Sequence, residues 1–154
     1  MAYGDLVDHL LMLSVCPGAI PVGKSKLENC RLVFKGSEKK GTIASIESAS
    51  NSNVPIVVYE VPDEELNGLD MYMKSPNLCY KMNRVVHFKD MRTDKDESVD
   101  AFTYVVRDVN FYGSPLAEYF LRCRIGYLHW GFDSTNLIEA YAKSKIPKAQ
   151  EIKI

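Results

Sequence analysis

Apolar residues recur at three- and four-residue steps in two segments, which is the spacing of one helix face. These steps predict helices over residues 5–13 and 115–130. Three consecutive carboxylates, which suit the positive end of a helix dipole, open a further predicted helix over residues 63–73. Gly131 is typical of a helix C-terminus, and another helix is expected over residues 134–144. The chain is therefore expected to end in two consecutive helices.

Extended patterns fill most of the remaining chain. They predict strands over residues 19–25, 29–35, 42–47, 54–61, 79–89 and 98–108, after a short first strand that ends at Tyr3. Residues 54–61 are apolar on both faces, as in a strand of a small barrel or of a covered sheet. Polar clusters at residues 48–53 and 90–97 are expected to be loops. This order of elements predicts an α+β fold.

The composition is that of an ordinary globular domain and excludes several classes of protein. The 154 residues fit one domain, with 46% hydrophobic and 25% charged residues. The net charge of -1 predicts no nucleic acid and no membrane as partners. The longest apolar run, residues 10–15, is too short to cross a bilayer, and Asp5 and Asp8 stand where a signal peptide would be positive. We therefore expect a cytoplasmic location.

The cysteines and histidines give no sign of a metal or a cofactor. The four cysteines contain no C-x-x-C pair, and the three histidines are scattered along the chain. A chain of this length can bury a core without disulfides. We therefore expect free buried thiols, no metal and no cofactor.

One segment matches the sequence motif of a phosphate-binding loop but not the structural context that such a loop needs. Residues 18–25 read G-x-x-x-x-G-K-S, but a phosphate loop needs a strand before it and a helix after it. Here a helical pattern precedes the motif, and residues 27–34 alternate like a strand. Pro21 also removes one amide from the loop. We interpret the segment as a strand with an exposed basic turn and reject a nucleotide-hydrolysing function.

Six segments, taken in order, carry a similarity to a known family. They are residues 2–6, 16–17, 22–34, 54–61, 69–80 and 115–133. With these motifs at these intervals, residues 2–140 resemble the gamma-glutamylcyclotransferase-like family. The resemblance implies a small mixed β-barrel with flanking helices and a ligand pocket at one mouth of the barrel. The domain would span residues 1–144, and residues 145–154 would form a charged tail.

Active members of this family release 5-oxoproline from gamma-glutamyl compounds. The substrate's own α-amine attacks its γ-carbonyl, so the enzyme has to move a proton and to stabilise an oxyanion. In the family, a glutamate after the motif L-D-x-Y moves the proton, and a Y-G-S-N loop binds the oxyanion. The resemblance therefore places ligand-binding residues at Tyr3, Gly4, Asp5, Leu6, Met73, Tyr80 and Tyr119.

This chain differs from the family at the positions that carry the chemistry. Met73 stands where the glutamate is expected and has no proton to transfer. Asp5 and Leu6 replace the serine and the asparagine of the loop. General acid–base catalysis contributes about 10²–10⁴-fold and an oxyanion donor about 10²–10³-fold, so the loss of both would leave little turnover. No catalytic residue is therefore expected.

The sequence leaves more than one function open. The first is a catalytically degenerate protein, a pseudoenzyme that binds or sequesters a small metabolite or signalling molecule in the barrel-mouth pocket. The alternative is an active gamma-glutamylcyclotransferase or amide-cleaving enzyme with a relocated acid/base, for which Asp5, Glu47 and Glu60 are the candidates. A third is an adaptor that binds protein through the barrel surface. The expected partner is a small-molecule ligand, with a homodimer as a further possibility.

Overall fold

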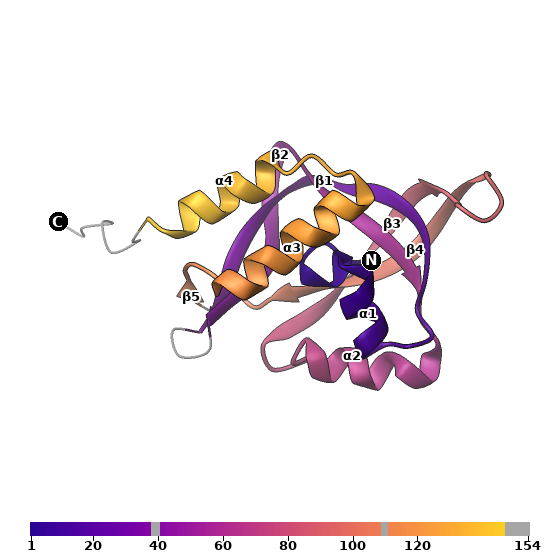
Figure 1. The fold of residues 1–154 in the computed structure, drawn as a ribbon, viewed down its shortest axis with the longest axis horizontal. Coiled ribbons are helices and arrows are strands. Elements are labelled where there is room, and N and C mark those ends of the chain that lie inside the picture. The colour runs from indigo at the N-terminus through magenta and orange to yellow at the C-terminus, as the bar shows by residue number, and fades with distance from the viewer. Residues whose placement is uncertain (38–40, 109–110, 147–154) are drawn as a thin grey trace.

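The computed structural model describes residues 1–37, 41–108 and 111–146 (Figure 1). Helices lie toward both ends of the chain, and one helix interrupts the strands between them. In chain order, with η for a 3-10 helix, the elements are η1 (Asp5–Val7), α1 (His9–Val15), β1 (Ile20–Ser37), β2 (Gly41–Glu60), η2 (Asp63–Glu65), α2 (Leu66–Tyr72), β3 (Cys79–Lys89), β4 (Asp96–Val106), β5 (Phe111–Tyr112), α3 (Ala117–Trp130) and α4 (Thr135–Ser144). The predicted α+β fold class is confirmed.

Two long strands, β1 and β2, form an antiparallel hairpin along most of the molecule (Figure 1). The short β5 pairs with β1 near the closed end of this hairpin. The predicted loop at residues 48–53 is wrong, because these residues belong to β2. Asn29 and Asn51 lie where the register shifts, with left-handed φ angles of 56° and 62°, so the strands bend while the ladder continues. Four predicted strands therefore merge into two.

The described strands form two separate sheets, so the predicted small barrel is not confirmed. β3 and β4 pair with each other as predicted, and side chains link β3 to β1. The Ser25 hydroxyl donates to the His87 carbonyl at 2.6 Å. Arg84 Nη1 donates to the Glu28 carbonyl at 3.3 Å. Among the described residues, these links stand in place of the regular backbone ladder that closes a barrel.

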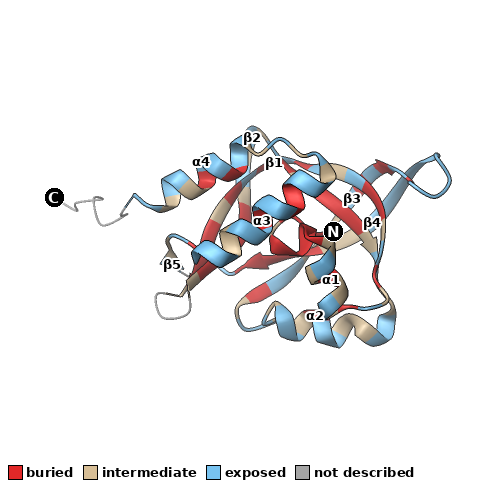
Figure 2. Cartoon of the chain, viewed as in Figure 1, coloured by how far each residue is buried: buried red, intermediate tan, exposed pale blue. Residues whose placement is uncertain are grey.

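The core lies between the two sheets and the helices that cover them (Figure 2). Consecutive residues of β2, among them Val57 and Val58, are buried although their side chains leave opposite faces of the strand. This burial confirms the predicted cover on both sides for residues 54–58, whereas Glu60 is exposed. All four cysteines are buried and form no disulfide. Within the described ranges, no helix is long and apolar enough to cross a membrane.

The helix α3 packs against the start of the chain with one side of its surface. Cys123 and Tyr127 are buried on that side. Leu116, one of the apolar residues that recur along the predicted helix, is exposed at the N-cap position. The helix begins at Ala117, two residues after the predicted start at residue 115. Gly131 ends the helix with a left-handed φ of 71°, as predicted.

The structure confirms the predicted strand in residues 18–25, but the expected basic turn is wrong, because Lys24 lies within β1. From Ile20 onward this segment belongs to β1, so no helix follows the glycine-rich letters. The Gly18 amide, which would face a phosphate in a phosphate loop, donates to the Glu65 carboxylate at 2.9 and 3.0 Å. A side chain of the protein thus occupies the position where an anion would bind.

Candidate functional site

The loop that follows the first residues of the chain begins in the centre of the fold. Ala2 exchanges two backbone hydrogen bonds with Val57 of β2, at 2.9 and 3.0 Å. Tyr3 is buried, and its hydroxyl donates to the carbonyl of Tyr104 on β4 at 2.5 Å. These bonds tie the loop to both sheets and fix the direction in which residues 4–6 leave the strand.

Gly4 and Tyr119 meet where α3 passes over the loop. The Tyr119 hydroxyl accepts a hydrogen bond from the amide of Ala44 on β2 at 2.9 Å. A Cβ atom at position 4 would lie 2.9 Å from that hydroxyl oxygen and 3.0 Å from the Cβ of Ala44. Glycine is therefore required here because the backbone approaches the tyrosine so closely.

Asp5 is the buried charged group of the loop. The Tyr72 hydroxyl donates to its carboxylate, and the N–H groups of Leu6 and of Asp5 itself also interact with it. Burial raises the pKa of Asp5, and these donors, together with the charge of Arg122, offset only part of the rise. The amides that face a substrate oxyanion in the enzymes described above therefore face a carboxylate of the chain itself.

Two of the predicted tyrosines, Tyr3 and Tyr119, lie near Asp5. Burial is the main cause that raises the pKa of Tyr3 and of Tyr119, and the charge of Asp5 adds to both shifts. Tyr3 and Tyr119 therefore stay protonated at neutral pH. Tyr80 lies on β3 and is partly exposed. The structure thus brings Tyr3 and Tyr119 to the predicted loop residues.

Met73 follows the last residue of α2 and is half-buried against the core. Its N–H donates to the Leu69 carbonyl at 3.0 Å and completes the last helical turn. The hydroxyl of the preceding residue, Tyr72, makes the polar contact between this segment and Asp5. A thioether therefore stands where the family resemblance predicts a glutamate, and the nearby polar contact comes from a phenol.

Of the three carboxylates considered for a relocated acid/base, only Asp5 lies in the loop. Glu47 pairs with Arg31, and although burial raises the pKa of Glu47, its hydrogen bonds outweigh burial and lower it. Glu60 accepts hydrogen bonds from Arg92 at its two oxygens, both at 3.0 Å. Glu47 and Glu60 are thus each held by a guanidinium group, and Glu47 also accepts a hydrogen bond from the Tyr112 hydroxyl at 2.9 Å.

Two titratable groups close to Met73 in the sequence are unsuited to proton transfer at neutral pH. Asp70 accepts a hydrogen bond from Tyr104 and pairs with Lys81 at 3.0 Å. Burial raises the pKa of Asp70, but these partners outweigh burial and lower it, so the carboxylate stays ionised. Burial raises the pKa of Cys79 to about 11, so its thiol stays protonated and is a poor nucleophile.

Two of the cavities in the described structure have volumes of about 500 Å³ or more, which is large enough for a small molecule. The first, about 500 Å³, is lined by strands β1 and β2 and by α4, with charged residues of both signs. The second, about 520 Å³, is lined by the β3–β4 hairpin, by α2 and by the ends of β1 and β2, and is called the hairpin cavity below. Of the predicted ligand-binding residues, Leu6 lines the hairpin cavity, and none of the others lines either cavity.

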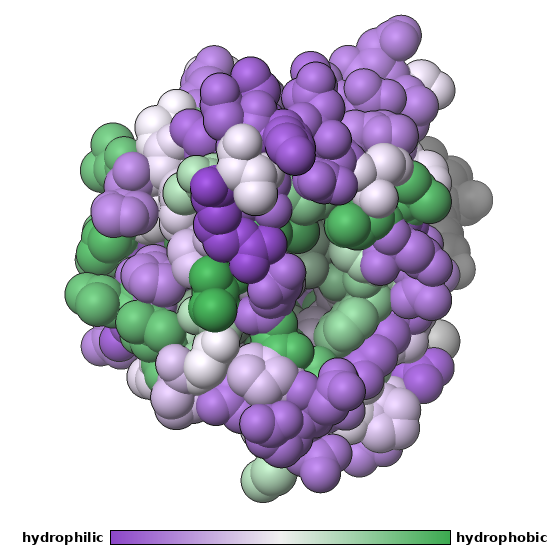
Figure 3. Space-filling view, turned by 90° about the vertical axis from the view of Figure 1, so that its right-hand side faces the viewer, coloured by the Kyte–Doolittle hydropathy of each residue, from purple (hydrophilic) through white to green (hydrophobic). Residues whose placement is uncertain are grey.

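The hairpin cavity has an apolar interior and a charged rim. Its lining includes the apolar side chains of Leu6, Met12, Leu69, Phe88 and Phe102. Its lining also includes the charged side chains of Glu60, Asp63, Asp90, Arg92, Glu97 and Asp100. The molecular face in Figure 3 is hollowed, with hydrophobic residues inside the hollow and hydrophilic residues around it.

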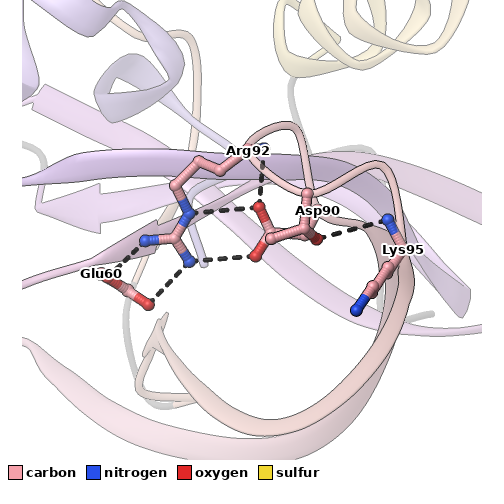
Figure 4. A network of polar contacts seen from close by, with 5 residues as sticks. Glu60, Asp90, Arg92 and Lys95 are labelled. Carbon is pink, nitrogen blue, oxygen red and sulfur yellow. Dashed lines mark hydrogen bonds and ion pairs between the residues drawn. The ribbon is translucent and has the colours of Figure 1, made fainter.

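A network around Arg92 holds one side of this rim (Figure 4). In addition to its bonds with Glu60, Arg92 donates to the two oxygens of Asp90 at 3.2 and 3.0 Å. The Asp90 N–H donates to the Lys95 carbonyl at 2.8 Å and closes the turn of the hairpin. The hydrogen bonds from Arg92 lower the pKa of Asp90, which therefore stays ionised. The network ties the end of β2 to the turn between β3 and β4.

Sequence reasoning missed two features of this region. Tyr72 lies within the L-D-x-Y segment, but its partner Asp5 is 67 residues away, and no pattern joins the two positions. The hairpin cavity combines residues of five segments, so no single segment signals it. The tyrosine of the L-D-x-Y motif was the one available sign of a polar group beside the loop.

The fold and the site define a class of small α+β protein. In this chain a tyrosine–glycine loop lies between the long hairpin and the helix α3. Residues 1–120 match the family described as gamma-glutamyl cyclotransferase, AIG2-like, and the chain belongs to this family. A comparison with curated proteins finds no match.

Solved structures of other proteins show the same fold. A structure described as a gamma-glutamyl cyclotransferase gives a TM-score of 0.76 at 18% identity, covering 96% of this chain and 87% of that chain. An uncharacterised protein from Homo sapiens gives 0.74 at 19% identity, with the same coverage of 96% and 87%. YkqA from Bacillus subtilis gives 0.68 at 16% identity, covering 93% of this chain and 52% of that chain. Identities this low show the fold alone.

Proposed function

We propose that this chain is a catalytically inactive member of its family that binds and sequesters a small molecule. The observation that carries the proposal is the contact between Asp5 and Tyr72 beside the loop amides. The loop is occupied by a group of the protein, and Met73 stands where a proton-transferring glutamate is required. Binding needs neither feature of the enzyme, whereas turnover needs interactions that stabilise the transition state.

Electrostatics also disfavour a gamma-glutamyl substrate at this loop. An oxyanion that formed there would lie beside the carboxylate of Asp5, which is buried. Like charges repel strongly where water is excluded, so the loop would destabilise the transition state that it stabilises in the enzymes. The substrate would have to displace Asp5 from the loop amides before it could bind.

The hairpin cavity is the proposed place of the ligand. It adjoins the predicted site through Leu6, which belongs to the loop, and through Leu69, one helical turn before Met73. A volume of about 520 Å³ lies within the range of known small-molecule sites. The proposal therefore moves the ligand from the loop itself to the apolar space next to it.

One observation favours the alternative of an active cyclotransferase. Burial raises the pKa of Asp5, and a carboxyl group of raised pKa is suited to general acid–base catalysis. In that mechanism, Asp5 would leave the loop amides, accept a proton from the substrate amine and return it to the leaving group. Tyr72 would then be free to bind the substrate.

The release of 5-oxoproline from gamma-glutamyl amino acids separates these two functions. We expect no release above background from the wild-type protein. We expect the double variant Asp5→Ser/Met73→Glu, which restores the family's loop serine and its glutamate, to gain roughly 10²-fold or more over wild type. Asp5→Ser/Met71→Glu is the matched control, since Met71 is 79% exposed on the same helix and its change adds the same carboxylate away from the loop.

Clear release by the wild-type protein would overturn the proposal if Asp5→Asn abolishes it and Met73→Ala does not. Binding is tested independently by native mass spectrometry of the purified protein. We expect a bound small molecule in the wild-type protein and its loss in Leu66→Trp, which fills the hairpin cavity. A wild-type protein that carries no ligand and binds none from a metabolite extract would contradict sequestration.

A further inference from the structure

We infer that the hairpin cavity binds an organic cation with an apolar body, that is, a primary amine on an aliphatic or aromatic group. The inference rests on the proposed function, because it names the chemistry of the molecule that the cavity would hold. It is carried by two separate features of the cavity, the apolar interior and the sign of the charge at the rim.

The interior of the hairpin cavity is lined mainly by apolar side chains. Leu6 and Met12 come from the start of the chain, Leu69 from α2, and Phe88 and Phe102 from the hairpin, and all five line the same space. Apolar groups from so many elements favour a ligand body that also loses apolar surface from water. On this basis each additional buried CH₂ group should strengthen binding about fourfold.

The rim is strongly negative. Among the charged side chains that line the cavity, five are carboxylates and one is the guanidinium of Arg92. Arg92 already binds Glu60 and Asp90, both through pairs of hydrogen bonds. The remaining three carboxylates, Asp63, Glu97 and Asp100, have no ion-pair partner among the residues that the structure describes.

A second positive group borders the cavity and does not reverse this sign. The amino group of Met1 donates to the Phe102 carbonyl at 2.8 Å. Burial lowers the pKa of this amino group to about 6, so it carries little charge at neutral pH. Unpaired carboxylates around a low-dielectric space concentrate a negative potential at its mouth. That potential attracts an ammonium group and repels a carboxylate or phosphate.

The test compares three probes that share one chain length and differ in charge: n-octylamine, 1-octanol and octanoate. Binding to the full chain is measured by isothermal titration calorimetry at pH 7 in 50 mM and 500 mM NaCl. We expect octylamine to bind at least tenfold more tightly than octanoate, and roughly 15-fold more tightly than hexylamine. Added salt should weaken octylamine several-fold and leave octanol nearly unchanged.

Variants on the hairpin distinguish the effect of the rim carboxylates on binding from the effect of surface charge in general. Glu97→Gln/Asp100→Asn removes two rim carboxylates and should weaken octylamine about five- to tenfold, with octanol unchanged. Asp94→Asn/Asp96→Asn is the matched control, because it removes the same charge from the same hairpin at residues that do not line the cavity. The control should change octylamine binding less than twofold. Leu66→Trp should abolish the binding of all probes.

Each outcome supports or overturns the inference. Equal binding of octylamine and octanoate, or equal loss in the rim variant and its control, overturns the amine preference but leaves small-molecule binding in place. Failure of every probe to bind overturns the inference, and the mass spectrometry described above then decides the proposed function separately. Binding of octylamine that survives Leu66→Trp places it outside the cavity and also overturns the inference.

Discussion

Asp5 stands where the family resemblance implies a serine, and its carboxylate changes what the loop amides contact. The side chain is long enough to turn back on the amides of its own loop, and burial prevents water from solvating it. Tyr72 compensates part of the lost solvation by donating a hydrogen bond. The loop thereby keeps the backbone shape that Gly4 and Tyr119 impose, while its binding groups are occupied by the protein.

The raised pKa of Asp5 predicts a pH dependence of stability. Between its ordinary value of 3.8 and its raised folded value, the folded state binds more protons than the unfolded state. The free energy of unfolding of the wild-type protein should therefore fall relative to Asp5→Asn as the pH rises from about 3.8. Urea unfolding of both proteins between pH 3.5 and 7 measures this difference.

Asp133→Asn is a control for which the difference in free energy of unfolding should change with pH in the opposite direction. Thr135 donates its hydroxyl and its amide to Asp133, at 2.7 and 2.9 Å, and these bonds lower the pKa of Asp133. The stabilising contribution of Asp133 is present above its unfolded pKa and is lost as the pH falls. The free energy of unfolding of the wild-type protein should therefore increase relative to that of Asp133→Asn as the pH rises. Parallel pH profiles for Asp5→Asn and wild type would contradict the burial of an ionisable Asp5.

At the scale of elements, the contact between α3 and the start of the chain holds the loop in place. A Cβ atom at Gly126 would lie 2.6 Å from the Asp8 amide nitrogen and 2.8 Å from the carbonyl carbon of Val7. The helix can pass over the junction of η1 and α1 only because position 126 has no side chain. The same helix carries Tyr119 to the loop.

Gly126→Ala should therefore destabilise the protein by about 1–3 kcal/mol, because the added methyl group overlaps rigid backbone. Gly68→Ala, in the middle of α2, is the control, since its Cβ atom would meet nothing closer than the Val15 carbonyl oxygen at 3.5 Å. It should leave stability unchanged or raise it by up to about 1 kcal/mol through helix propensity. Chemical unfolding checks both values, and equal effects of the two changes would refute the packing argument.

At the scale of the whole molecule, the two sheets are joined by a few specific links. The Arg92 network connects the hairpin turn to β2, and the Met91 amide donates to the Val22 carbonyl of β1 at 2.8 Å. These links define one wall of the hairpin cavity, because a closed ladder does not hold the β3–β4 hairpin in place. The width of the cavity should therefore depend on Arg92.

Arg92→Gln should loosen the turn, because it leaves Asp90 and Glu60 without their shared cation. We expect hydrogen exchange at the Met91 amide to become several-fold faster, with exchange in the centre of β2 unchanged. Lys89→Gln is the control, since Lys89 and Asp94 form an exposed pair at 3.8 Å that should contribute little. Equal protection of Met91 in wild type and Arg92→Gln would show that the network does not hold the turn.

The sequence by itself determined the features that depend on local spacing. Helical periodicity identified the helices, although the first is broken at Asp8 into η1 and α1, and Gly131 marked the end of α3. The order of short motifs identified the family, and the absence of a titratable group at Met73 could be read directly. These predictions succeed because backbone geometry and residue chemistry act over a few positions.

The tertiary structure alone decided which distant groups meet. It bent β1 and β2 at Asn29 and Asn51 instead of breaking them, and it kept the two sheets separate. It placed the Tyr72 hydroxyl on Asp5 and enclosed the hairpin cavity between segments far apart in the chain. The physical reason is that burial and hydrogen bonding between distant residues depend on how whole elements pack, which no local pattern records.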